Sequence, residues 1–242
     1  MQNLFPPAAP NPSVVPPFFL ESPLAWRYHR PSPLGRLEQG AAVNLDATNI
    51  LPLTAGHAAQ LAALHQAGLH AGFLSSLGPR FLTQLYAAIP ATASGFGFVA
   101  EKQGRVIGFI TCADRLGALY RQALKARGLR MALVLLPAMF RWGTVRQIGE
   151  TLLFPARIED KYPPAEILSI VVDPAARGSG VARDLMNLAF TEFRRRGIRQ
   201  LKVQVWTENP AAKRYYEKCG FRLAGQTLHH QEMQDIYVIE LT

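Results

Sequence analysis

The sequence predicts an α/β (α+β) protein in which strands and helices alternate around one sheet. Two observations support this fold class. Residues 166–173 alternate and are rich in β-branched side chains, as a buried strand is, and a glycine-containing turn leads from them into an apolar-periodic helix over 181–196. A second alternating strand, 200–206, leads to a helix that begins with the capping pair Asn209-Pro210.

The turn between these first two elements has the composition of an anion-binding loop. It contains Arg177, Gly178, Ser179, Gly180, Val181 and Ala182. The first N–H groups of a helix have no partner within it and lie at the positive end of its dipole. Glycines let the backbone approach a diphosphate closely, and Arg177 adds a permanent positive charge. The turn therefore predicts a site for a phosphorylated cofactor.

Two blocks of this region resemble the acetyl-CoA-binding segment of the GNAT superfamily of N-acetyltransferases. Arg177, Gly180 and Ala182 stand where the family has Gln or Arg, then Gly, then Gly or Ala. The second block of the family is matched at Asn209, Ala212, Tyr216, Gly220 and Phe221. The resemblance is specific for 166–221 and looser for 51–114. It implies a GNAT fold, with a central mixed twisted sheet flanked by helices, to which this chain adds a helical insertion before the cofactor-binding strand.

The resemblance also implies a reaction, the transfer of an acetyl group from acetyl-CoA to a primary amine of a small molecule, amino sugar or protein. Attack would be direct, in a ternary complex. Tyr216 is the expected general acid for the leaving thiolate, and Glu166, directly or through water, is the expected general base. The expected cofactor contacts are Ile170, Val171, Val172, Arg177, Gly178, Ser179, Gly180, Val181, Ala182, Asn209 and Tyr216. No metal is expected.

Each role has a structural alternative that the sequence leaves open. Tyr216 also suits an aromatic that packs the last helix on the sheet, and Glu166 also suits a solvated carboxylate at a strand end. His65 and His70 are candidate acceptor-site residues that also suit structural roles. The alternative function is a non-catalytic module that holds acyl-CoA for sensing or scaffolding. The presence of Tyr216 and Asn209 favours the enzyme.

Composition agrees with a globular acyl-CoA enzyme. The chain has 242 residues, of which 49% are hydrophobic and 18% charged. The net charge of +9 is spread along the chain without an aromatic ladder or a zinc-ligand spacing, so no nucleic-acid partner is expected. The only cysteines, Cys112 and Cys219, do not form a disulfide framework. Together with the lack of a signal peptide or apolar span, they predict a cytoplasmic protein.

The chain divides into a leader, 1–45, and a domain, 46–242. Half of all prolines lie between Pro6 and Pro33, interleaved with aromatic residues, so the leader is expected to be either disordered or an arm that packs on a neighbouring surface. The domain begins with one helix after Thr54 and another after Gly78. Strands 97–101 and 106–113 then form a predicted hairpin.

Residues 115–160 predict a helical insertion before the cofactor strand. An amphipathic basic helix over 116–130 is followed by an apolar run over 131–140 that Pro137 interrupts, and by a further helix over 141–154. An extra helical layer, a substrate lid, and peripheral contact of 125–146 with a membrane all remain open. The last segment, 235–241, alternates as an edge or closing strand, which leaves a homodimer open. The amine acceptor and the acyl-chain preference are not predictable from the sequence.

Overall fold

The computed structural model describes residues 48–242 except for 70–72, 140–145, 152–157, 159 and 231. The predicted leader, the proposed boundary after residue 45 and His70 lie outside the described residues. All described residues belong to one unit of the chain, Asn44–Thr242.

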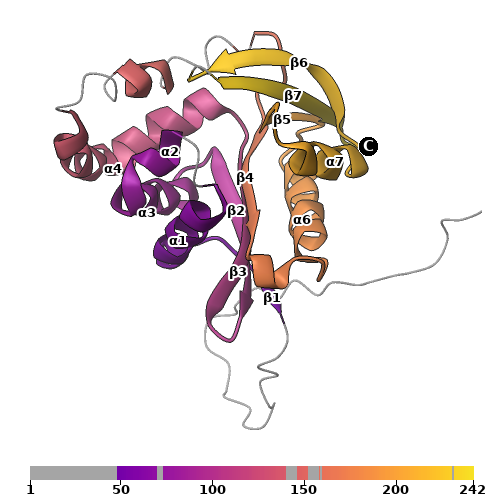
Figure 1. Ribbon diagram of the computed structural model, residues 1–242, viewed down its shortest axis with the longest axis horizontal. Coiled ribbons are helices and arrows are strands. Elements are labelled where there is room, and N and C mark those ends of the chain that lie inside the picture. Colours follow the sequence, from indigo (N-terminus) through magenta and orange to yellow (C-terminus); the bar gives the residue numbers. More distant parts are fainter. Residues whose placement is uncertain (1–47, 70–72, 140–145, 152–157, 159, 231) are drawn as a thin grey trace, which may run out of the picture. The chain divides into compact units, whose positions relative to one another are not determined.

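The described strands form one seven-stranded sheet in the order β1-β2-β3-β4-β5-β7-β6 (Figure 1). The strands are β1 (Asn49–Pro52), β2 (Gly95–Lys102), β3 (Arg105–Ala113), β4 (Glu166–Val172), β5 (Gln200–Trp206), β6 (Arg222–His229) and β7 (Glu232–Glu240). All neighbours are antiparallel except β4 and β5, which run parallel. The sheet is therefore mixed, as the sequence predicts.

Helices cover both faces of the sheet (Figure 1). On one face lie α1 (Ala58–Gly68), α2 (Phe73–Ser76), α3 (Gly78–Ala88) and α4 (Leu116–Met139); on the other lie α6 (Val181–Arg195) and α7 (Pro210–Lys218). Three short 3-10 turns, Ala55–His57, Ile89–Ala91 and Pro174–Ala176, connect these elements. Among the described helices, none is long and apolar enough to cross a membrane.

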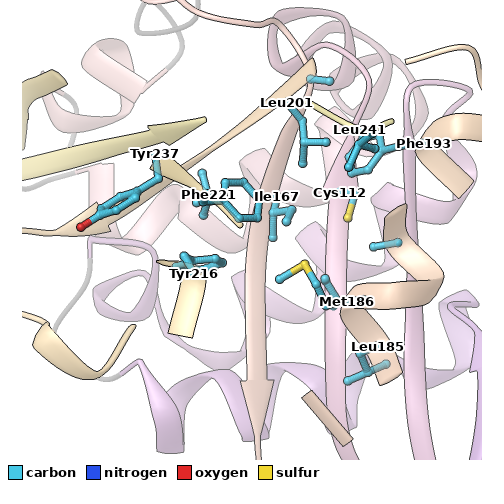
Figure 2. Packing of buried hydrophobic residues seen from close by; sticks show 14 of the residues in the cluster. Cys112, Ile167, Leu185, Met186, Phe193, Leu201, Tyr216, Phe221, Tyr237 and Leu241 are labelled. Carbon is cyan, nitrogen blue, oxygen red and sulfur yellow. The ribbon is translucent and has the colours of Figure 1, made fainter. Parts of the chain in front are cut away.

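The period-two alternation of the strands divides the core between the two faces. Ile110, Ile167 and Val203 pack with Phe193 and other residues of α6 and α7. Figure 2 shows Ile167 and Phe193 in this cluster. The intervening positions, among them Phe109 and Val171, pack against α1 and α3 on the opposite face. Both faces of the central strands are thus buried, which fixes α6 and α7 relative to β4.

The insertion differs from its predicted helices. One helix, α4, covers both 116–130 and most of 131–140, which were predicted as separate segments. Pro137 lies within the last turn of α4, where the loss of its N–H removes a bond near the helix end, and α4 ends at Met139. Of the further helix predicted over 141–154, residues 146–151 are helical and the rest lie outside the described residues.

The C-terminal strand closes the sheet rather than forming its edge. β7 pairs with β5 on one side and with β6 on the other, so the edge alternative for 235–241 is wrong. The edge on this side of the sheet is β6, a strand that the sequence does not predict. Its residues are mostly exposed, including Leu223 and Leu228, and so they lack the strong apolar alternation of a half-buried strand.

Candidate active site

β4 and β5 separate soon after they begin. Their parallel pairing consists of Glu166 with Lys202 and Ile167 with Val203, although both strands continue beyond these residues. Beyond Ile167, no described strand pairs with the side of β4 that faces β5. The two strands therefore diverge toward their carboxyl ends, and we call the space between them the opening.

The backbone direction of β4 makes this opening polar. The Asp173 N–H donates to the Ile107 carbonyl on the β3 side, at 2.8 Å. Because N–H and C=O groups alternate between the two sides of an antiparallel strand, those of Ile170 and Val172 point the other way, toward β5. These are the two residues whose backbone the family resemblance assigns to the pantetheine arm.

The N-terminus of α6 lies at the end of β4 and offers free donors. Gly180 is its N-cap, with a left-handed φ of 89° that glycine adopts without strain. The first bond within the helix runs from the Asp184 N–H to the Gly180 carbonyl, at 3.1 Å. No described residue accepts from the N–H groups of Gly180, Val181 or Ala182. A 15-residue helix thus directs unpaired donors and the positive end of its dipole into the loop.

Two contacts hold this end of α6 in place. A Cβ at Gly108 of β3 would lie 2.9 Å from Val181 Cγ1, so only glycine allows α6 to start this close to the sheet. The Tyr215 hydroxyl donates to the Ala182 carbonyl at 2.8 Å, which joins α7 to the first turn of α6. Sequence analysis missed this role of Tyr215, because its only signal was a second tyrosine beside Tyr216.

The carboxylates around the loop are neutralised. Asp173 pairs with Arg105 at 2.7 Å and also accepts from the Ala175 N–H at 3.0 Å. Asp184 pairs with Arg183 at 3.1 Å. Arg177 is exposed, and no described carboxylate pairs with it. The loop is therefore electropositive, as a diphosphate site requires.

Tyr216 projects from α7 into the core cluster and is 6% exposed. Its ring makes edge contacts with Tyr215 and Phe221, each with a centroid separation of 5.5 Å. Figure 2 shows Tyr216 and Phe221 in the core cluster. Burial raises the pKa of the Tyr216 phenol above its ordinary value, so the hydroxyl keeps its proton at neutral pH. No described residue shares a hydrogen bond with this hydroxyl. The ring therefore packs as a core aromatic while its proton remains available to a ligand.

Asn209 is the N-cap of α7, as predicted. Its side-chain oxygen accepts from the Ala212 N–H at 3.0 Å, which leaves the Asn209 amide nitrogen as a donor. The residue lies just beyond the end of β5, on the far side of the opening from α6. One side chain can thus cap the helix and offer two N–H groups to a ligand.

Glu166 is not the solvated strand-end carboxylate of the structural alternative. It is 4% exposed, and its Oε1 accepts from Gln204 Nε2 at 2.7 Å. Its Oε2 lies 3.3 Å from Nζ of Lys202, a residue that is 0% exposed and that also donates to the Pro163 carbonyl at 2.7 Å. A buried ion pair therefore joins β4 to β5 where the two strands diverge.

Three buried oxygens near this pair have no hydrogen-bond partner: Thr111 Oγ1, Glu166 Oε2 and Gln204 Oε1. Buried polar atoms of this kind usually bind water or a ligand. Burial, and then the charge of the Glu166 carboxylate, raise the pKa of the Tyr120 phenol on α4. Polar groups of β3, β4, β5 and α4 thus lie on the face of the sheet that α1, α3 and α4 cover, opposite the face that packs against α6.

A second buried polar contact lies on the same face. His65 Nδ1 and the Tyr86 hydroxyl are 2.5 Å apart. Burial lowers the pKa of His65 to about 4, so the ring is neutral at pH 7. His65 therefore joins α1 to α3 from inside the core, and the structure places it 4% exposed rather than on an open acceptor surface.

A splayed parallel strand pair beside a glycine-capped helix N-terminus defines an acyl-CoA-dependent transferase fold. The profile of the acetyltransferase (GNAT) family matches residues 69–221, and the chain belongs to this family. No group of three His, Cys, Asp or Glu residues that could hold a metal ion occurs in the described part of the chain.

Curated relatives match over a part of their length. A mycothiol acetyltransferase of Geodermatophilus obscurus is 33% identical over 82 residues, 33% of this chain and 27% of the relative. Another, of Streptosporangium roseum, is 41% identical over 59 residues, 24% of this chain and 18% of the relative. An uncharacterised N-acetyltransferase of Methanocaldococcus jannaschii is 39% identical over 62 residues, 26% of this chain and 27% of the relative. The chain thus spans less than a third of each of these relatives.

Solved structures share the fold. An N-acetyltransferase from Staphylococcus aureus Mu50 superposes with a TM-score of 0.53 and 17% identity, over 81% of this chain and 100% of that chain. A structure from Salmonella typhimurium that contains its cofactor acetyl-CoA gives a TM-score of 0.53 and 17% identity, over 81% and 95%. At these identities the likeness concerns the fold alone.

Proposed function

We propose that the protein transfers the acetyl group of acetyl-CoA to a primary amine of a small molecule, amino sugar or protein, by direct attack in a ternary complex. The observation that carries this proposal is the opening between β4 and β5, which ends at the unpaired N–H groups of α6. An anionic, amide-bearing ligand is the complement of such a site.

Different residues around the opening bind different parts of acetyl-CoA. The N–H groups of Gly178, Gly180, Val181 and Ala182 and the charge of Arg177 serve the diphosphate, while the Ser179 N–H already donates to the Ala176 carbonyl at 3.4 Å. The backbone of Ile170 and Val172 serves the amides of the pantetheine arm, with Val171 between them holding β4 against α1 and α3. The free amide nitrogen of Asn209 serves the arm from the β5 side. Bound there, acetyl-CoA supplies an activated acyl group.

Two side chains move the protons. Tyr216, whose hydroxyl is protonated at neutral pH, donates its proton to the sulfur as the carbon–sulfur bond breaks. Glu166 Oε2 accepts the proton that the amine releases when its nitrogen bonds to the carbonyl carbon. Because this oxygen is buried and without a hydrogen-bond donor, the proton reaches it through a water molecule. Lys202 and Gln204 keep the carboxylate at the strand junction.

An amine-dependent release of CoA thiol tests this proposal. Purified protein is incubated with acetyl-CoA and a panel of diamines, amino sugars and peptide N-termini, and the acetylated product is identified by mass. The expected result is thiol release that requires both an amine and the intact Tyr216. Binding of acetyl-CoA without turnover of any amine would instead support the acyl-CoA-binding module.

A further inference from the structure

The second half of α4 presents large apolar side chains to solvent. Leu129, Leu133 and Leu136 are 77%, 58% and 50% exposed, and their spacing places them on one face of the helix. Ala126 and Ala132 are exposed on the same face. The opposite face packs Met131 and Leu135 against α3. We call the residues Ala126, Leu129, Ala132, Leu133 and Leu136 the leucine stripe.

Cations border the leucine stripe, and α4 contains no acidic residue. Arg121, Lys125 and Arg130 are exposed, and no carboxylate in the described part of the chain pairs with them. At about 100° per residue, Lys125 lies on the face of the stripe, while Arg121 and Arg130 lie on either side of it. An apolar strip edged by unpaired positive charge is the pattern of a helix that binds at an anionic interface.

We propose that this face of α4 binds the surface of an anionic lipid bilayer. The helix lies along the interface, with the leucine stripe at the acyl boundary and Arg121, Lys125 and Arg130 among the headgroups. Charge argues against a second copy of the chain as the occupant, because the same cations would then face one another across the contact.

The bilayer would lie along the helix that also carries Tyr120. Tyr120 is nine residues before Leu129 in the same helix. At about 1.5 Å per residue, the stripe begins roughly 14 Å along the helix axis from Tyr120. The inference goes beyond the proposed acetyl transfer and does not depend on it, since lipid binding is measured without acetyl-CoA or amine.

Vesicle co-sedimentation of the full chain tests the proposal. Phosphatidylcholine vesicles with and without phosphatidylserine are compared at low and at high salt. We expect binding to the vesicles that contain phosphatidylserine, a loss of binding as salt rises, and little binding to phosphatidylcholine alone.

Matched variants locate the surface. Leu129→Gln/Leu133→Gln is expected to lower the vesicle affinity at least about tenfold. Lys125→Gln/Arg130→Gln is expected to lower it about thirtyfold at low salt, at roughly fivefold per cation. The controls are Leu223→Gln/Leu228→Gln, whose leucines are 57% and 61% exposed on β6, and Lys102→Gln/Lys218→Gln, two exposed lysines on other elements. Both controls should bind as the wild type does.

Three results would overturn the proposal. The first is the absence of binding to phosphatidylserine vesicles at low salt, or equal binding by the leucine variant and its control. The second is a dimer in light scattering that Leu129→Gln/Leu133→Gln abolishes, which would assign the stripe to a second copy. The third is a lower melting temperature of the leucine variant without any vesicle binding by the wild type, which would mean that another segment of the chain covers the stripe.

Discussion

Tyr215 and Tyr216 are adjacent in the sequence, but their hydroxyl groups have different roles. The Tyr215 hydroxyl is used within the protein, on the Ala182 carbonyl, and the Tyr216 hydroxyl has no partner among the described residues. Burial raises the pKa of both phenols, so neither ionises near neutral pH. The difference in partners, rather than in acidity, makes Tyr216 the candidate acid.

Replacing each tyrosine by phenylalanine separates these roles. Tyr216→Phe should lower kcat about 100-fold or more, because the thiolate loses its proton donor, while the Kd for CoA changes little because the ring contacts remain. Tyr215→Phe should instead raise the Kd about fivefold, by loosening the first turn of α6, with kcat nearly unchanged. Steady-state kinetics and calorimetry measure both. An unchanged kcat in Tyr216→Phe would exclude it as the acid.

The Glu166–Lys202 pair predicts a strong non-additivity in stability. Lys202→Met leaves a buried carboxylate without its cation and should lower the free energy of unfolding by about 3–5 kcal/mol. Lys202→Met/Glu166→Gln removes both charges, keeps an acceptor for Gln204, and should recover part of that loss. Urea unfolding of the two single variants and the double variant tests this. Additive losses would mean that the two charges are not coupled.

At the scale of elements, the sequence predicts the bounds of those helices and strands whose ends are marked by residues within the segment itself. β4, α6, β5 and α7 were predicted nearly to the residue, because strand alternation is followed there by Gly180 or by the Asn209-Pro210 cap. Edge strands β1 and β6 were not predicted, since most of their residues are exposed. The sequence divides α4 after residue 130, where the basic amphipathic pattern changes to an apolar run, although one helix continues through both.

The sequence predicts only those parts of the site that lie within one short segment of the chain. The loop before α6 and the cap of α7 are contained in short segments, so the sequence revealed them. The pairing of Glu166 with Lys202 and Gln204 depends on the register of β4 against β5, which is a tertiary property. The contact of Tyr215 with Ala182 likewise joins residues 33 positions apart.

The packing of α6 on β3 can be tested by paired substitutions. Gly108→Ala places a Cβ about 2.9 Å from Val181 Cγ1 and 3.3 Å from the Val171 carbonyl, so we expect a loss of stability of about 1–3 kcal/mol and weaker acetyl-CoA binding. Gly108→Ala/Val181→Ala removes the tightest contact and should recover much of the affinity. Thermal melts and calorimetry measure both effects. Failure of the second substitution to restore affinity would contradict this packing role.

For the whole molecule, neutral buried histidines make stability depend on pH. His65 has a folded pKa of about 4 against an ordinary value near 6.5, so the fold favours its neutral form. The contribution of His65 to the free energy of unfolding is fully present above pH 6.5 and is lost as the pH falls toward 4. Between pH 7 and pH 5 this loss is about 2 kcal/mol. His229, with its pKa lowered to about 4, adds a loss of the same sign.

Urea unfolding at pH 7 and pH 5 tests this linkage. The wild type should lose more stability on acidification than His65→Gln, by about 2 kcal/mol, because the variant has no imidazole to protonate at this position. A residual loss should remain in the variant because His229 is unchanged. Equal losses in the two proteins would show that His65 does not titrate in this range.

Binding of acetyl-CoA at the N-terminus of α6 is the central claim, and a thermal-shift titration with acetyl-CoA tests it most directly. Three proteins are compared: the wild type, Gly180→Leu, and the control Gly104→Leu. Gly180 and Gly104 both have a positive φ, of 89° and 75°, so both substitutions cost backbone strain of about 1–2 kcal/mol, but Gly104 lies in the β2–β3 turn.

The melting temperatures of the wild type and Gly104→Leu should rise with acetyl-CoA concentration, by the equivalent of about 2.7 kcal/mol at a hundred times the Kd. That of Gly180→Leu should not, because its side chain occupies the approach of the diphosphate to the helix N–H groups. No rise in the wild type at millimolar acetyl-CoA, or an equal rise in all three proteins, would contradict the assignment of the cofactor site.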